Sequence, residues 1–78
     1  MSIEEKVKGV FKNVLDIKPE EIKLAEKLDQ SLGIDSTEMV EIAVAIKKEF
    51  GLDMASSDIK KTQSLNEIIE FLKSNGAN

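Results

Sequence analysis

The chain has 78 residues, with 15 acidic and 11 basic side chains and a net charge of −4. It contains no Cys, which excludes disulfides and thiolate metal sites. It also contains no His, and every basic residue is a lysine. An acidic chain without arginine is a poor match for nucleic-acid phosphates, which are bound by clustered cations, so we expect no nucleic-acid partner.

The length predicts one small domain over residues 1–78, close to the lower limit for a fold held by a single apolar core. No segment approaches the roughly 18 consecutive apolar residues that span a bilayer. The acidic start, Met1-Ser2-Ile3-Glu4-Glu5, has no apolar signal core. We therefore expect a cytoplasmic monomer with no membrane association, and the lack of Cys fits a reducing compartment.

The first helix is predicted to begin after Ser2, because Glu5 completes a capping box three residues on. Apolar residues then recur at the three- and four-residue spacings of an amphipathic helix: Ile3, Val7, Val10, Phe11, Val14 and Leu15. Residues 16–34 form a long connection, in which Pro19 can open a helical turn. Four spaced apolar side chains are expected to pin this connection to the core: Ile22, Leu24, Leu28 and Leu32.

The second helix is predicted to begin after Asp35, which forms a capping box with Glu38, and to end at Gly51. Its expected inward face is formed by five apolar side chains: Met39, Ile42, Ala43, Ile46 and Phe50. Val40 and Val44 lie on another flank and are expected to stay partly exposed. An apolar patch surrounded by charge is typical of a protein-binding surface. The alternative is that Leu28 or Ile34 of the preceding connection covers these valines.

Residues 57–61 are expected to form at most a short helix, with Lys60 and Lys61 as charges that complement the dipole at its end. Ser64 and Glu67 form another capping box and open the last helix. The expected buried side chains of that helix are Leu65, Ile68, Ile69, Phe71 and Leu72. It ends at 75–76, and residues 75–78 are expected to fray. The chain shows no strand pattern, so the predicted fold is all-α, a small bundle of three main helices plus one short helix.

Ser36 falls in the first turn of the second helix, where most serines are simply helix-start residues. A phosphate ester at this position would meet free backbone N–H groups and the positive end of the helix dipole. No His is available to activate the hydroxyl for nucleophilic catalysis. Lys47 and Lys48 lie about three turns away, roughly 16 Å along the helix axis. We therefore interpret Ser36 as an attachment point and expect neither catalytic residues nor a metal site.

The run Leu32-Gly33-Ile34-Asp35-Ser36, followed by Glu38, Val40 and Glu41, resembles the attachment motif of acyl carrier proteins and related phosphopantetheine carriers. The likeness in helix order covers nearly the whole chain. It implies that Ser36, next to Asp35, is esterified by 4′-phosphopantetheine. The donor would be coenzyme A, the catalyst a separate Mg²⁺-dependent phosphopantetheinyl transferase, and the cargo an acyl thioester on the terminal thiol.

The resemblance also implies that acyl-processing enzymes dock on the second helix, and the expected contacts are Thr37, Glu38, Val40, Glu41, Val44, Lys47 and Lys48. Two features depart from the family pattern. Thr37 stands where the family commonly has Leu, and Lys47 and Lys48 stand where fatty-acid carriers commonly have acids. Lys47 and Lys48 would repel the basic residues of a partner that normally pairs with acids at these positions. We therefore expect a specialised carrier in fatty-acid or related lipid or secondary-metabolite synthesis. An aminoacyl or peptidyl carrier, or an unmodified helical interaction module, remains an alternative.

Overall fold

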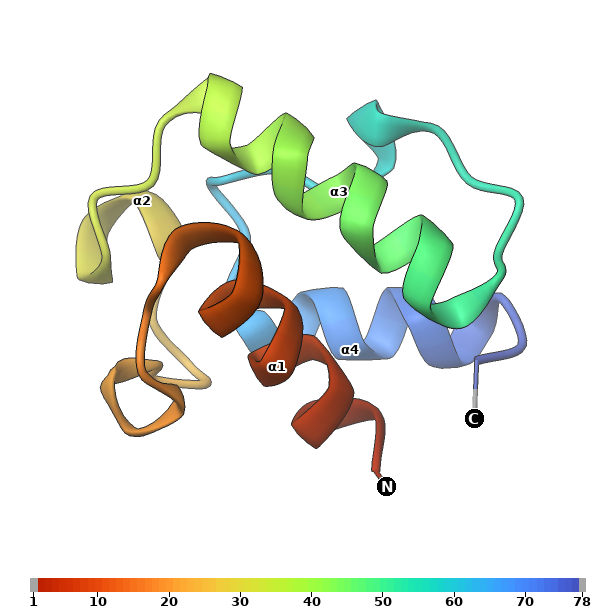
Figure 1. The fold of residues 1–78 in the computed structure, drawn as a ribbon, viewed down its shortest axis with the longest axis horizontal. Helices are drawn as coiled ribbons and strands as arrows, with labels where there is room; N and C mark the ends of the chain where they lie inside the picture. The colour runs from red at the N-terminus through yellow and green to blue at the C-terminus, as the bar shows by residue number, and fades with distance from the viewer. Residues whose placement is uncertain (1, 78) are drawn as a thin grey trace.

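The computed structural model describes residues 2–77, which form a helical fold (Figure 1). Its elements are α1 (Ile3–Leu15), the 3₁₀ turn η1 (Pro19–Glu21), α2 (Leu28–Ser31), α3 (Ser36–Phe50), the 3₁₀ turn η2 (Ser56–Asp58) and α4 (Leu65–Ser74). Within this range the only strand-like pairing is an isolated antiparallel bridge between Lys27 and Ser64. The predicted all-α fold is therefore confirmed. No helix in the described range is both long and apolar enough to cross a membrane.

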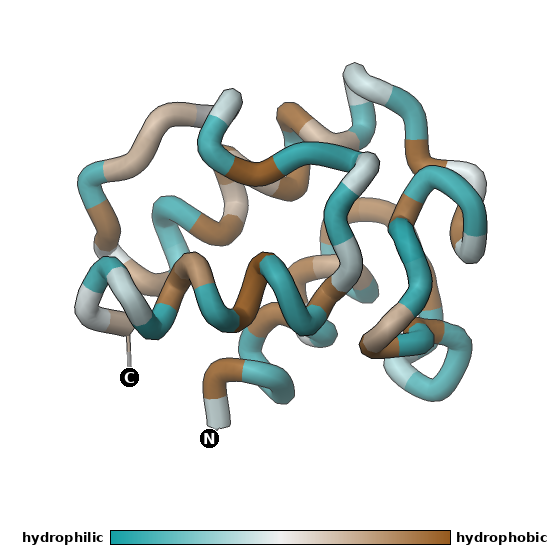
Figure 2. Tube along the Cα trace, turned by 180° about the vertical axis from the view of Figure 1, so that it is seen from behind, coloured by the Kyte–Doolittle hydropathy of each residue, from teal (hydrophilic) through white to brown (hydrophobic). Residues whose placement is uncertain are grey.

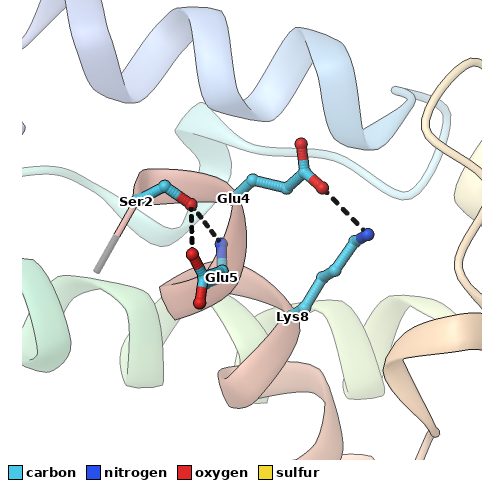
Figure 3. A network of polar contacts seen from close by, with 4 residues as sticks. All are labelled: Ser2, Glu4, Glu5 and Lys8. Atoms are coloured by element: carbon cyan, nitrogen blue, oxygen red, sulfur yellow. Dashed lines mark hydrogen bonds and ion pairs between the residues drawn. The ribbon is translucent and has the colours of Figure 1, made fainter.

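Helix α1 begins as its sequence predicts, with Ser2 as the N-cap (Figure 3). The Ser2 Oγ accepts a hydrogen bond from the Glu5 N–H at 3.1 Å. The same hydroxyl donates to Glu5 Oε1 at 3.2 Å. One turn further on, the Lys8 Nζ donates to Glu4 Oε2 at 3.0 Å, an i,i+4 pair that supports the exposed side of the helix.

The three long helices enclose one core, with α1 packed against both α3 and α4. Figure 2 shows that hydrophobic and hydrophilic residues are mixed along the chain. In each long helix the buried apolar residues recur at spacings of about three and four, so each helix turns one apolar face inward. The largest fully buried side chains are Phe11, Leu28, Ile42, Ile46, Ile59, Leu65, Ile68 and Leu72. These residues come from all three long helices and from the two connections beside α3, so the core fixes the position of α3.

The long connection between α1 and α3 has its own structure, which explains its length. Pro19 opens the turn η1, as predicted, and α2 is an additional single turn that was not predicted. Leu28 at the start of α2 is fully buried. The Leu28 N–H donates to Gln63 O at 3.0 Å, and the Asp29 N–H donates to Lys61 O at 2.9 Å. These bonds tie the connection to the segment that precedes α4.

The segment after α3 corrects one sequence interpretation. The helix expected over 57–61 is only the turn Ser56–Asp58, and Ile59 leaves it to enter the core. Lys60 and Lys61 follow in a loop that precedes α4. The turn ends at Asp58 with no basic residue in its last turn, and cations that precede the N-terminus of α4 do not complement that helix's dipole. The interpretation of Lys60 and Lys61 as helix-end charges was therefore wrong, and another role must be sought for them.

Helix α4 begins at the predicted capping box, with Ser64 as the N-cap of Leu65–Ser74. The Ser64 Oγ accepts from the Glu67 N–H at 3.3 Å, and Glu67 Oε1 accepts from the Ser64 N–H at 3.1 Å. After the helix, the Ala77 N–H donates to Leu72 O at 3.0 Å. The expected fraying of residues 75–78 stays a prediction, and Asn78 lies outside the described residues.

Candidate functional site

Ser36 is the first residue of α3, and its side chain is exposed. The capping box fixes the backbone on both sides of it. The Glu38 N–H donates to Asp35 Oδ1 at 2.8 Å, and the Asp35 N–H donates to Glu38 Oε1 at 3.1 Å. The Met39 N–H makes the first backbone bond of the helix, to Asp35 O at 2.9 Å. The N–H groups of Ser36 and Thr37 thus have no acceptor within the helix and are available to an acceptor outside it.

The predicted inward face of α3 is confirmed, since Met39, Ile42, Ala43 and Ile46 are buried and Phe50 is half-buried. The helix ends at Gly51, whose φ of 63° is the left-handed conformation that glycine adopts without strain. The ends and the inward face of α3 are therefore all fixed. Its remaining side chains are presented to the surface in a defined order.

Val40 and Val44 are exposed by 49% and 44% of their surface, which confirms the predicted apolar patch. The alternative, that Leu28 or Ile34 covers them, was wrong, because both of these residues are themselves buried in the core, with 0% and 3% exposure. At 100° per residue, the exposed side chains that share this outward face are Thr37, Val40, Glu41, Val44, Lys47 and Lys48. We call this set the α3 face.

Glu38 lies outside the α3 face. It is half-buried, and its carboxylate already accepts the Asp35 N–H. Its first role is therefore structural, because it closes the capping box that positions Ser36. Any contact of Glu38 with a partner stays a prediction.

A groove of about 300 Å³ begins at Ser36. It runs between the N-terminal half of α3 and the segment that follows η2. Its lining residues are Ser36, Met39, Val40, Ser57, Ile59, Lys60, Lys61 and Thr62. The groove is therefore mainly apolar, and the segment that follows η2 adds Lys60 and Lys61 to its lining. The lone sequence signal for this segment was the pair Lys60-Lys61, and its place beside Ser36 depends on the tertiary fold.

This arrangement fits a covalently attached phosphate ester. The Ser36 hydroxyl is exposed, and among the described residues no side chain is hydrogen-bonded to it. Esterification therefore breaks no side-chain hydrogen bond of Ser36, and the free N–H groups of the helix start suit an anion. The structure shows no group of three or more His, Cys, Asp or Glu in the described range that could hold a metal ion.

Residues 5–72 match the family model described as "Phosphopantetheine attachment site". The acyl carrier protein of Nitratidesulfovibrio vulgaris, in strains DP4 and Hildenborough, is 32% identical over 72 residues, which cover 92% of this chain and 95% of the relative. The chain belongs to the acyl carrier protein family. The acyl carrier protein of Campylobacter hominis is also similar, with 27% identity over 73 residues, 94% of this chain and 92% of the relative.

As a member of the acyl carrier protein family, this chain is a non-catalytic carrier with a covalent 4′-phosphopantetheine group. The family expectation drawn from the motif is thus confirmed. The chain also has a second, larger groove of about 590 Å³ at the other end of the α3 face, lined by Val44, Lys47, Lys48 and Leu52 among others. The two lysines that depart from the family pattern therefore lie beside exposed apolar surface.

Proposed function

We propose that Ser36 is the residue that carries 4′-phosphopantetheine, and that residues 1–78 act as one carrier domain. The observation that supports this most directly is the place of Ser36, exposed and without a side-chain hydrogen-bond partner at the first position of α3. The groove that begins at Ser36 leaves room on one side for an attached group. When bound, the group supplies a thiol that holds an acyl cargo as a thioester.

In the attachment step, the Ser36 Oγ bonds to the phosphorus of coenzyme A that bears the pantetheine. The bond from that phosphorus to the bridging oxygen of the pyrophosphate breaks, and adenosine 3′,5′-bisphosphate leaves. The proton of the Ser36 hydroxyl must go to a base on the transferase, because the chain has no His and the described structure places no base on Ser36. Mg²⁺ on the transferase would neutralise the phosphates.

We further propose that the α3 face binds the transferase and successive acyl-processing enzymes. Val40 and Val44 supply apolar contact, while Glu41 attracts basic partner residues. An exposed ion pair contributes only about 0.2–1 kcal/mol. Weak pairs around a small apolar patch suit a carrier that must leave each enzyme after one step. We propose that this takes place in the cytoplasm, with the carrier as a monomer.

Lys47 and Lys48 support a specialised role in fatty-acid or related lipid or secondary-metabolite synthesis. Both side chains are exposed on the α3 face. They would repel a partner surface built to meet acids at that end of the helix. The partners of this carrier would therefore present neutral or acidic groups there.

The attachment site is tested with a promiscuous phosphopantetheinyl transferase, coenzyme A and Mg²⁺, followed by intact-protein mass. Wild type should gain the mass of one 4′-phosphopantetheine group, and Ser36→Ala should gain none. Ser57→Ala is the matched control, because Ser57 is also exposed and lines the same groove, and this variant should load like wild type. Circular dichroism checks that both variants are folded.

If Ser36→Ala still gained the mass of the group, the group would be attached to another residue. A wild type that stays unmodified, while a known carrier loads in the same tube, would instead favour an unmodified helical interaction module. The cargo is then identified by mass spectrometry of the thioester on protein isolated from its native cell. An aminoacyl or peptidyl thioester there would contradict the proposed acyl pathway.

A further inference from the structure

Lys60 and Lys61 are cations without an assigned role, and both line the groove that Ser36 also lines. The ion pairs found within residues 2–77 join Lys8 to Glu4 and Lys23 to Glu26, so neither groove lysine is neutralised by a carboxylate of the described chain. Most of the groove's lining is apolar, from Met39, Val40 and Ile59. Unpaired cations that share a groove with apolar side chains favour a ligand that is anionic at one point and apolar next to it.

The loop that bears these lysines has a defined conformation. The Lys60 N–H donates to Gln63 Oε1 at 2.9 Å, and the Gln63 N–H donates to Lys60 O at 3.1 Å, which closes a tight turn. Ile59, directly before the turn, is buried with 2% exposure. The turn is therefore fixed by two features, the burial of Ile59 in the core and the hydrogen bonds between Lys60 and Gln63.

The same loop is also tied to α2. The carbonyl oxygens of Lys61 and Gln63 accept the N–H groups of Asp29 and Leu28 at 2.9 and 3.0 Å. These bonds use only the backbone, so both lysine side chains stay free for another partner. The backbone positions of Lys60 and Lys61 relative to Ser36 are consequently set by the fold before any ligand is present.

We infer that this groove is a subsite for the base of the prosthetic arm, in which Lys60 and Lys61 hold the phosphodiester anion. The inference rests on the proposed attachment to Ser36. An ester on the Ser36 Oγ places its phosphate at the mouth of the groove, because Ser36 itself lines that groove. The dimethyl-substituted carbon that follows the phosphate is apolar and matches Met39, Val40 and Ile59.

The arm's own phosphate is a better match for this subsite than an anion from solution. Covalent attachment keeps it at high effective concentration beside the lysines, so even weak charge pairs are populated. The N–H groups of Ser36 and Thr37 attract the same phosphate from the helix side. The Asp35 carboxylate repels this phosphate. The lysines therefore also offset the negative charge of Asp35. The docked arm is released when a partner enzyme offers stronger contacts.

The test compares amide NMR spectra of the ¹⁵N-labelled protein without the arm and with the unloaded arm, whose thiol is free. In wild type, attachment should shift the amide signals of residues 36–40 and also those of residues 57–62. In Lys60→Gln/Lys61→Gln the shifts at 57–62 should be lost, while those at 36–40 remain. Lys12→Gln/Lys73→Gln removes the same charge from exposed positions on α1 and α4, away from the α3 face, and should keep both sets.

The ³¹P signal of the attached phosphodiester gives a second readout. It should respond to added salt in wild type and in the Lys12→Gln/Lys73→Gln control, and lose that response in Lys60→Gln/Lys61→Gln, because salt screens the lysine–phosphate attraction. The single Lys60→Gln variant, at an exposed position, should show part of the loss and guards against misfolding of the double variant.

Shifts confined to residues 36–40 in wild type would overturn the inference, as would shifts at 57–62 that survive in the Lys60→Gln/Lys61→Gln variant. Shifts at 57–62 that appear only after loading of an acyl group with its own carboxylate would assign the lysines to the cargo and likewise overturn it. A protein that accepts no arm under loading conditions would contradict the proposed function instead, so the two failures are distinguishable.

Discussion

Asp35 and Glu38 each accept a hydrogen bond from the other's backbone N–H, and Ser36, the proposed attachment residue, lies between them. The Asp35 carboxylate accepts the Glu38 N–H at 2.8 Å, and the Glu38 carboxylate accepts the Asp35 N–H at 3.1 Å. Ser36 lies between them in the sequence, so the position of its hydroxyl follows from this pair. The capping box thus begins α3 and also positions Ser36.

The first prediction concerns this pair. Asp35→Ala should destabilise the protein by about 0.5–2 kcal/mol, because the Glu38 N–H loses its acceptor. It should also slow loading of Ser36, since the first turn of α3 then frays. Urea unfolding measures the stability, and intact mass over time measures the loading. Asp35→Asn retains an acceptor oxygen and should keep most of the stability. Equal losses in both variants would mean that charge, and not capping, stabilises this turn.

The second prediction compares two glycines whose surroundings leave equal room. A Cβ at Gly9 or at Gly51 would meet no atom within 4 Å, but Gly51 has a φ of 63°. Gly51→Ala should therefore destabilise by about 1–2 kcal/mol through backbone strain alone. Gly9 lies inside α1, where alanine should stabilise by about 0.5–1 kcal/mol. Denaturation midpoints that move in the same direction for the two variants would contradict this.

The third prediction separates the α3 face from the core. Ile46 is completely buried and Val44 is 44% exposed, although they lie two residues apart on α3. Ile46→Ala should cost about 2–5 kcal/mol of unfolding free energy, because it leaves a cavity. Val44→Ala should change stability by no more than about 0.5 kcal/mol, yet raise the KM of partner enzymes. A Val44→Ala variant as unstable as Ile46→Ala would show that Val44 is packed.

Local signals made much of this structure predictable from sequence. The three predicted N-caps, Ser2, Asp35 and Ser64, are all confirmed, because a cap is read within four residues. The full capping box forms at Asp35 and Ser64, whereas the Glu5 carboxylate accepts the Ser2 hydroxyl in place of its backbone N–H. The inward and outward faces of α3 follow equally from helical spacing. The attachment of an arm was predicted from the motif around Ser36, and family membership confirms the arm, though not the residue.

Features that depend on distant contacts were not predictable in the same way. Helix α2 is one turn long, too short for a periodic pattern, and it is held by backbone bonds to Lys61 and Gln63. The place of Lys60 and Lys61 also depends on distant contacts, so the sequence pattern alone led to the wrong interpretation of both as helix-end charges. Their approach to Ser36 arises when the loop is fixed against α2, and no spacing rule relates residues so far apart in the chain.

The last prediction tests whether Lys47 and Lys48 set partner choice. Lys47→Glu/Lys48→Glu restores acids at the end of the α3 face and should lower the KM of standard fatty-acid elongation enzymes for the loaded carrier by about 3- to 30-fold. The gain should shrink at high salt, because the charges are exposed. Lys12→Glu/Lys73→Glu makes the same change in net charge on α1 and α4, and it should leave KM nearly unchanged. If wild type is extended as efficiently as the usual carrier, or if both double variants gain equally, the lysines do not discriminate between partners.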